Sequence, residues 1–87
     1  MPMTSEQKPR VYSDQINFVM REVLQTLSNI DFAHQVEIEK VENSRSDEAL
    51  KEYIKDKLRR THQQRRQPYV DLLNELRWQQ HQQSFAA

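Results

Sequence analysis

The 87-residue chain contains no glycine and no cysteine. Glycine is the usual residue at positive φ, so primed hairpin turns, phosphate-binding loops and nucleophile elbows all rely on it. Its absence argues against sheet-rich and nucleotide-binding folds and leaves long helices with few tight turns. The lack of cysteine excludes disulfides and thiolate metal sites, and a small domain without such cross-links fits a reducing cytosol better than secretion. We therefore expect a cytoplasmic protein.

Long apolar runs and an excess of charge are also missing. Thirteen basic residues balance 13 acidic ones, so the net charge of zero gives no overall attraction to nucleic acid or anionic membrane. No apolar stretch approaches the ~18 residues that would suggest a membrane span. Residues 1–10 are polar and lack the apolar segment of a signal peptide. We expect one small domain without a membrane segment, whose modest core would gain from a partner or a second copy.

Apolar residues recur at helical spacing along the first half of the chain. Ser13 and Asp14 suit a helix start, because a hydroxyl caps the first turn and an acid complements its dipole. The spacing i, i+3, i+4, i+7 predicts one helix over about 14–43. The alternatives are a break near 29–31 or a short strand at 36–39, where apolar and acidic residues alternate. The apolar stripe comprises Ile16, Val19, Met20, Val23, Leu24, Leu27 and Ile30, continued by His34, Ile38 and Val41.

A polar linker at 43–46 is followed by a second predicted helix over about 47–80. Ser46 supplies a capping hydroxyl, and two acids follow it in the first turn. Pro68 lacks the N–H that would bond to residue 64, so it predicts a kink or an almost in-line restart of the helix. Glu52 and Asp56 are spaced to pair with basic residues three or four positions further on. The series 50, 54, 58, 61, 65, 69, 72, 76 predicts a nearly continuous seam that weakens at Thr61 and Arg65. The predicted apolar face of this helix is Ala49, Leu50, Tyr53, Ile54 and Leu58, followed beyond Pro68 by Tyr69, Leu72, Leu73 and Leu76.

These patterns predict an all-α fold, a helical hairpin of two long helices with the second kinked at Pro68. A lone pair of helices leaves much apolar surface in water, so we expect two copies to dimerise into a four-helix bundle. Residues 1–12 are expected to form a flexible N-terminal arm, 13–82 the single helical domain, and 83–87 a frayed C-terminal tail.

Basic residues cluster in the second helix, and no acid lies between positions 57 and 66. Such a surface suits phosphate groups or an acidic protein partner. The alternative is that the cluster solvates one helix face and pairs with the acidic stretch 31–48. In a hairpin that turns near 44–46, residues 57–66 would face about 25–34 and would overlap that stretch only in part. The cluster consists of Lys57, Arg59, Arg60, Arg65 and Arg66.

Several large apolar residues lie off the main stripes. On the first helix two phenylalanines and a valine fall opposite the apolar stripe, and Trp78 falls opposite the apolar face of the second helix. Aromatic residues on a second face often anchor interfaces with other proteins. The alternative is that they close a bundle core that is contacted from two sides. The predicted protein-contact residues are Phe18, Phe32, Val36, Tyr69 and Trp78.

Chemical sites are not evident. His34, His62 and His81 share no metal-ligand spacing, and the His34–Glu37 pair is not repeated as in di-metal bundles. No carboxylate pair, activated nucleophile or oxyanion loop is specified. We therefore expect no catalytic residue, no metal and no cofactor.

The function that these features favour is that of a small non-enzymatic adaptor or regulatory protein acting through helical protein–protein contacts. One alternative is a nucleic-acid-binding regulator that uses the cluster at 57–66. The other is an assembly subunit whose helices complete a larger complex. The sequence does not identify the partner protein.

Overall fold

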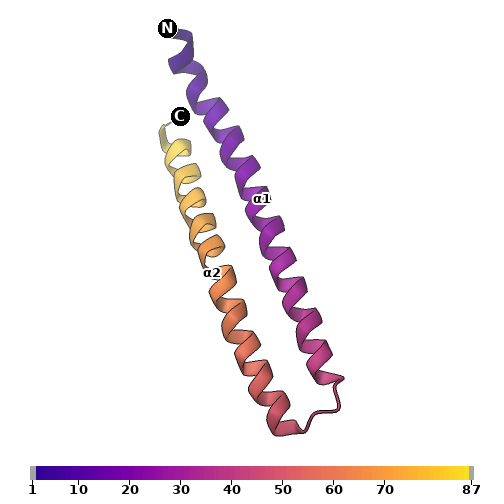
Figure 1. Cartoon of the computed structure of the whole chain (residues 1–87). Helices are drawn as coiled ribbons and strands as arrows, with labels where there is room; N and C mark the ends of the chain where they lie inside the picture. The colour runs from indigo at the N-terminus through magenta and orange to yellow at the C-terminus, as the bar shows by residue number, and fades with distance from the viewer. Residues whose placement is uncertain (1, 87) are drawn as a thin grey trace.

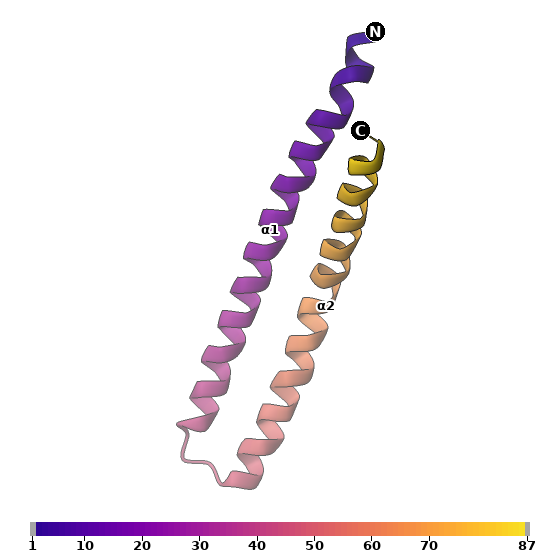
Figure 2. The same cartoon turned by 180° about the vertical axis from the view of Figure 1, so that it is seen from behind.

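A computed structural model of the protein shows two helices packed side by side as an antiparallel hairpin, α1 (Pro2–Glu42) and α2 (Glu48–Ala86) (Figures 1 and 2). The structure describes the backbone of residues 2–86 and the side chains of residues 14–83. Within that part of the chain there is no strand, which confirms the all-α hairpin prediction. The molecule measures 68 × 16 × 16 Å, and its radius of gyration of 19.8 Å exceeds the roughly 12 Å of a compact chain of this length. A rod of this shape has one long seam and very little interior.

α1 runs unbroken through 29–31 and 36–39, so the break and the strand considered for those positions are both wrong. A strand there would have no neighbouring strand to pair with, whereas a helix keeps Ile38 and Val41 half-buried. α1 begins at Pro2 rather than at the predicted start near Ser13. Proline is well suited to a first helical position, because the N–H that it lacks would have no partner within the helix.

The end of α1 is closed by local hydrogen bonds. The backbone N–H and the hydroxyl of Ser44 both donate to the Val41 carbonyl, at 3.1 and 2.7 Å. The Lys51 ammonium donates to the Glu42 carbonyl at 3.0 Å, which places a positive charge at the negative end of the helix dipole. No described residue has a positive φ, so this turn forms without glycine.

The start of α2 is capped by Asp47. Its carboxylate accepts a hydrogen bond of 2.8 Å from the Leu50 N–H, and its carbonyl accepts the first helical bond, from Lys51 N–H at 3.0 Å. The predicted cap, Ser46, is therefore one residue too early. A carboxylate at this position also complements the positive end of the helix dipole.

α2 begins beyond the end of α1, as Figure 1 shows at the turn. Glu42 bonds to Lys55, and Asp31 bonds to Arg66, so the helices are offset at the turn. Residues 57–66 consequently lie opposite a stretch of α1 about six residues closer to the turn than predicted. The overlap with the acidic stretch 31–48 is larger than the expected partial one. Leu50 is 46% exposed because it lies in the overhanging first turn of α2.

The apolar core occupies only the half of the hairpin nearest the chain ends. Between residues 28 and 72 only Lys55 is buried. The half nearest the turn is therefore held largely by polar contacts and half-buried side chains. The core consists of Ile16, Val23 and Leu27 of α1 and Leu73 and Leu76 of α2, with Met20 and Val70 packed against them.

The face that α2 turns toward α1 differs from the predicted seam. The residue that faces α1 is in several cases the one after a predicted seam position, which is about 100° further around the helix. Apolarity alone does not mark the seam because the polar residues there find partners across it. Most of the predicted stripe instead flanks the seam, with Thr61 and Arg65 exposed, whereas Leu76 lies in the core. The displaced pairs are Ile54 and Lys55, Thr61 and His62, and Arg65 and Arg66. Leu73, which the predicted apolar face included, is buried, whereas its neighbour Leu72 is exposed.

Three further predictions concern Pro68 and the two ends of the chain. α2 is a single helix with Pro68 in its interior. The flexible arm predicted for 1–12 and the frayed tail predicted for 83–87 lie largely in segments whose side chains the structure does not describe. Both stay predictions. Neither helix, over the residues that the structure covers, combines the length and apolarity needed to cross a membrane.

Candidate functional site

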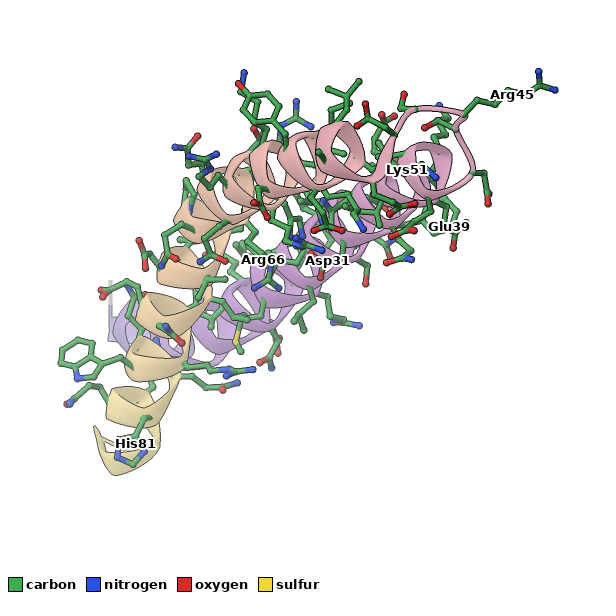
Figure 3. The ribbon with its side chains drawn as sticks, turned by 90° about the horizontal axis from the view of Figure 1, so that it is seen from below. Asp31, Glu39, Arg45, Lys51, Arg66 and His81 are labelled. Atoms are coloured by element: carbon green, nitrogen blue, oxygen red, sulfur yellow. The ribbon has the colours of Figure 1, made fainter. Side chains whose placement is uncertain are left out.

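Asp31 of α1 is held by two residues of α2 near the middle of the hairpin. The His62 Nε2 and Asp31 Oδ1 atoms lie 2.6 Å apart, and Arg66 donates from Nε and Nη2 to the two carboxylate oxygens at 3.1 and 3.3 Å. Figure 3 shows Asp31 and Arg66 meeting between the two ribbons. The hydrogen bond with His62, and then those from Arg66, lower the pKa of Asp31 against the opposing effect of burial. The three residues form a polar clamp between the helices.

His34 of α1 stacks on His62, with ring centroids 4.0 Å apart and planes 7° from parallel. Burial lowers the pKa of His34, and the nearby charges of His62 and Arg59 act in the same direction. The sequence spacing gave no sign of this pair because the two residues meet only across the seam. Within residues 14–83, no three side chains of the metal-ligand type come together.

Lys55 is the one buried charged residue of the described part of the chain, at 7% exposure. Its ammonium contacts Glu42 Oε1 of α1 at 2.6 Å and Glu52 Oε1 of its own helix at 2.8 Å. Hydrogen bonds to these carboxylates raise the pKa of Lys55, and the bond from Lys55 lowers the pKa of Glu42. The pairing of Glu52 three residues before Lys55 confirms the predicted spacing. The contact with Glu42 was not predicted, because it depends on the offset of the helices.

The basic cluster predicted at 57–66 does not form one surface. At 100° per residue its five members point to different sides of α2. Lys57 lies 5.3 Å above the Tyr53 ring, Arg59 pairs with Asp56 at 3.0 Å, and Arg66 belongs to the clamp on Asp31. Arg60 donates to the Asp56 carbonyl at 3.5 Å, and Arg65 points into a groove. These contacts favour the ion-pairing interpretation of the cluster.

Four aromatic side chains among residues 14–83 are more than half exposed. Phe32 is 72% exposed and Phe18 58% on α1, while Trp78 is 58% and Tyr53 56% exposed on α2. Three of them are predicted contact residues, whereas Tyr53 was placed with the apolar face of the second helix. Of the remaining predicted contact residues, Val36 is half-buried and Tyr69 is 38% exposed.

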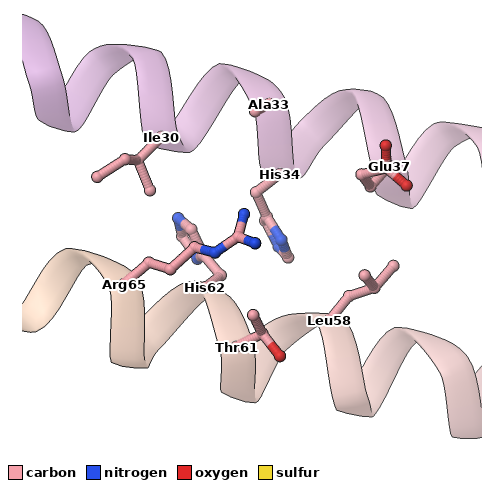
Figure 4. A pocket seen from close by; sticks show the side chains of 8 residues that line it. All are labelled: Ile30, Ala33, His34, Glu37, Leu58, Thr61, His62 and Arg65. Carbon is pink, nitrogen blue, oxygen red and sulfur yellow. The ribbon is translucent and has the colours of Figure 1, made fainter.

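A groove of about 300 Å³ runs between the helices beside the stacked histidines. In Figure 4, Arg65 extends along the groove toward His34, and Glu37 and Leu58 face each other further along it. Its walls combine apolar and polar side chains. The lining residues are Ile30, Ala33, His34 and Glu37 of α1 and Leu58, Thr61, His62 and Arg65 of α2.

Comparison with protein families, curated proteins and solved structures gave no match to this chain. The geometry of the side chains is therefore the basis for any functional proposal.

Proposed function

We propose that this chain is a small non-enzymatic adaptor or regulatory protein that acts through helical contacts with other proteins. The observation that carries the proposal is the set of aromatic side chains held away from the seam. Phe18, Phe32 and Trp78 lie on the outer sides of the rod, and each exposes more than half of its surface. Exposed aromatic side chains on rigid helices lose little entropy on binding and are frequent anchors of protein interfaces.

The contacts of the basic residues support a protein partner over a nucleic acid. Arg59 and Arg66 are engaged with carboxylates, and Lys57 lies over an aromatic ring. A phosphate backbone is bound best by several free cations on one continuous surface. The cations of this helix are instead divided among its sides.

The finer architecture belongs to the same proposal. A rod with a short core leaves apolar surface along most of its length, so we expect two hairpins to associate into a four-helix bundle. We also expect Pro68 to bend α2, because its ring lacks the N–H for the Gln64 carbonyl and crowds the preceding turn.

Site-specific photo-crosslinking tests the proposal. A photoreactive phenylalanine analogue replaces Phe32 or Trp78, and the control carries it at Gln63, which is exposed on α2. In the cells that contain the protein, we expect a cross-linked product with a different protein from the first two positions and not from the control. Products that are equally abundant from all three positions, or no product from any, would count against the adaptor function.

A further inference from the structure

The groove beside the histidines is part of a longer face of the hairpin. On α2, the positions that line it recur every three or four residues and continue to Ile54 on one side and to Tyr69 and Leu72 on the other. Tyr69 and Leu72 are 38% and 41% exposed, although they belong to the most regular apolar stripe of the helix. We call this side of the molecule, from Ile54 to Leu72 together with the groove, the groove face. The hairpin itself covers this face only in part.

Two charged residues line the groove, and they have opposite signs. Arg65 is exposed, and Glu37 has a side chain 54% exposed with a weak ion pair to Lys40 at 3.6 Å. A covering partner that complements these charges presents an acid to Arg65 and a base to Glu37. The order of these charges along the rod restricts which partner fits.

The positions of these charges along the rod can be compared with the level of the stacked histidines. Glu37 is three residues after His34, and Arg65 is three residues after His62. Because the helices are antiparallel, these steps lead in opposite directions, about 4.5 Å each along the rod. Ile30 and Leu58 lie four residues before the two histidines, so they too are displaced from the histidine level in opposite directions along the rod.

A second copy meets this requirement. A two-fold axis that is perpendicular to the rod and parallel to the groove face, at the level of the histidines, places a second copy over this face and exchanges the two directions. Arg65 of each copy then reaches the level of Glu37 of the partner subunit. The same operation brings Ile30 of each copy to the level of Leu58 of the partner subunit. An interface of this kind is complementary to itself, as two-fold dimers require.

We propose that the groove face is covered by a second copy of this chain, antiparallel to the first, with Arg65 of each copy paired to Glu37 of the partner subunit. The inference rests on the proposed function and names one partner and one surface for it. The outer aromatic residues stay free in this dimer and remain accessible to a different protein.

Charge reversal with a mixing step tests this arrangement. In Glu37→Arg both groove positions are basic, and in Arg65→Glu both are acidic, so each variant repels its own copy. We expect either change to raise the dissociation constant of the dimer at least about tenfold, because opposed like charges at an interface cost more than the ~1.4 kcal/mol that a factor of ten represents. An equimolar mixture pairs every Arg with a Glu and should restore the wild-type mass in sedimentation equilibrium. The matched control is Arg45→Glu, which makes the same charge change at the turn, where Figure 3 shows Arg45 pointing away from both helices.

A second measurement does not depend on charge. The chain has no cysteine, so copies carrying Ala33→Cys and copies carrying Thr61→Cys can be mixed and oxidised. Each of these residues precedes one of the stacked histidines by one position, so the two-fold axis brings them to the same level. We expect a disulfide-linked dimer in this mixture and none from copies that carry Arg45→Cys alone, because position 45 lies at the turn, far from the axis in both copies.

Three results would overturn the proposal: a wild-type mass of one chain up to about 100 µM, a dimer that the groove variants weaken no more than Arg45→Glu does, or no disulfide-linked dimer in the mixture of the Ala33→Cys and Thr61→Cys copies. If cross-links from Phe32 and Trp78 to another protein persist alongside any of these results, the adaptor function stands and only the dimer fails. The reverse pattern, a restored dimer without such cross-links, supports the dimer and removes the adaptor.

Discussion

The clamp on Asp31 should be the most sensitive polar site in the hairpin. Asp31→Asn keeps the size of the side chain and one acceptor oxygen but removes the charge that binds Arg66 through two hydrogen bonds and His62 through a third. The guanidinium would then remain between the helices with an uncharged partner. The turn half of the rod has few buried apolar residues to compensate for this loss.

The expected cost follows from the exposure of the groups. Hydrogen bonds to charged groups contribute about 1.5–3 kcal/mol when they are well shielded from water. Here the Asp31 side chain is 45% exposed and that of Arg66 is 30% exposed, so water screens part of the interaction. We expect Asp31→Asn to lower the free energy of unfolding by about 1–2 kcal/mol, which lowers Tm by about 5–15 °C in a domain of this size.

Urea unfolding followed by circular dichroism measures this loss, at one fixed protein concentration because association would shift the midpoint. The control is Glu39→Gln, which removes an equal charge from an exposed side chain that accepts one bond of 3.4 Å from Gln35. That variant should change the free energy of unfolding by less than about 0.5 kcal/mol. If Asp31→Asn is no more destabilising than Glu39→Gln, the clamp contributes nothing and the reasoning is refuted.

Three further predictions concern pH, the core and Pro68. The pKa of His34 in the fold lies below its ordinary value of 6.5, so the unfolded chain binds more protons than the folded chain between the two values. The free energy of unfolding should therefore fall as the pH drops below 6.5, and His34→Gln should abolish this loss in melting curves recorded at several pH values. Because the pKa of Asp31 is also lowered, a second loss should follow below its ordinary value of 3.8, and it should be absent from Asp31→Asn. Leu27→Ala should cost about 2–4 kcal/mol in urea unfolding, whereas Leu50→Ala, in the overhanging turn, should cost less than about 1 kcal/mol; equal costs would contradict the one-sided core. Pro68→Ala restores a backbone donor inside α2 and should raise the free energy of unfolding by about 1–3 kcal/mol, and a decrease would show that the hairpin depends on the proline.

Local signals in the sequence predicted the helices well. The periodic apolar residues of the first half specify α1 because every position of the stripe except Val19 and Leu24 is at least half-buried. The polar linker at 43–46 and the spacing between Glu52 and Lys55 also correspond to the observed turn and ion pair. Each of these features depends on residues close together in the chain.

The candidate sites depend on residues far apart in the chain, and there the sequence was less informative. His34 and His62 carry no shared spacing, so their stacking follows only from the offset between the helices. The seam of α2 was misplaced by about one position because Lys55, His62 and Arg66 look like surface residues until their partners on α1 are known. The exposure of Phe32 and Trp78 could be predicted, since it needs only the helical period.

The hairpin is apolar in the half nearest the chain ends and polar in the half nearest the turn, so different conditions loosen the two ends of the rod. Salt and acid weaken charged contacts, so they should release the pairs at Asp31 and Lys55 and open the helices from the turn. Cooling weakens apolar burial, which acts on the leucines near the chain termini instead. In a hairpin built in this way, the end nearest the turn responds to salt and acid, while the apolar core near the chain termini holds the two helices together.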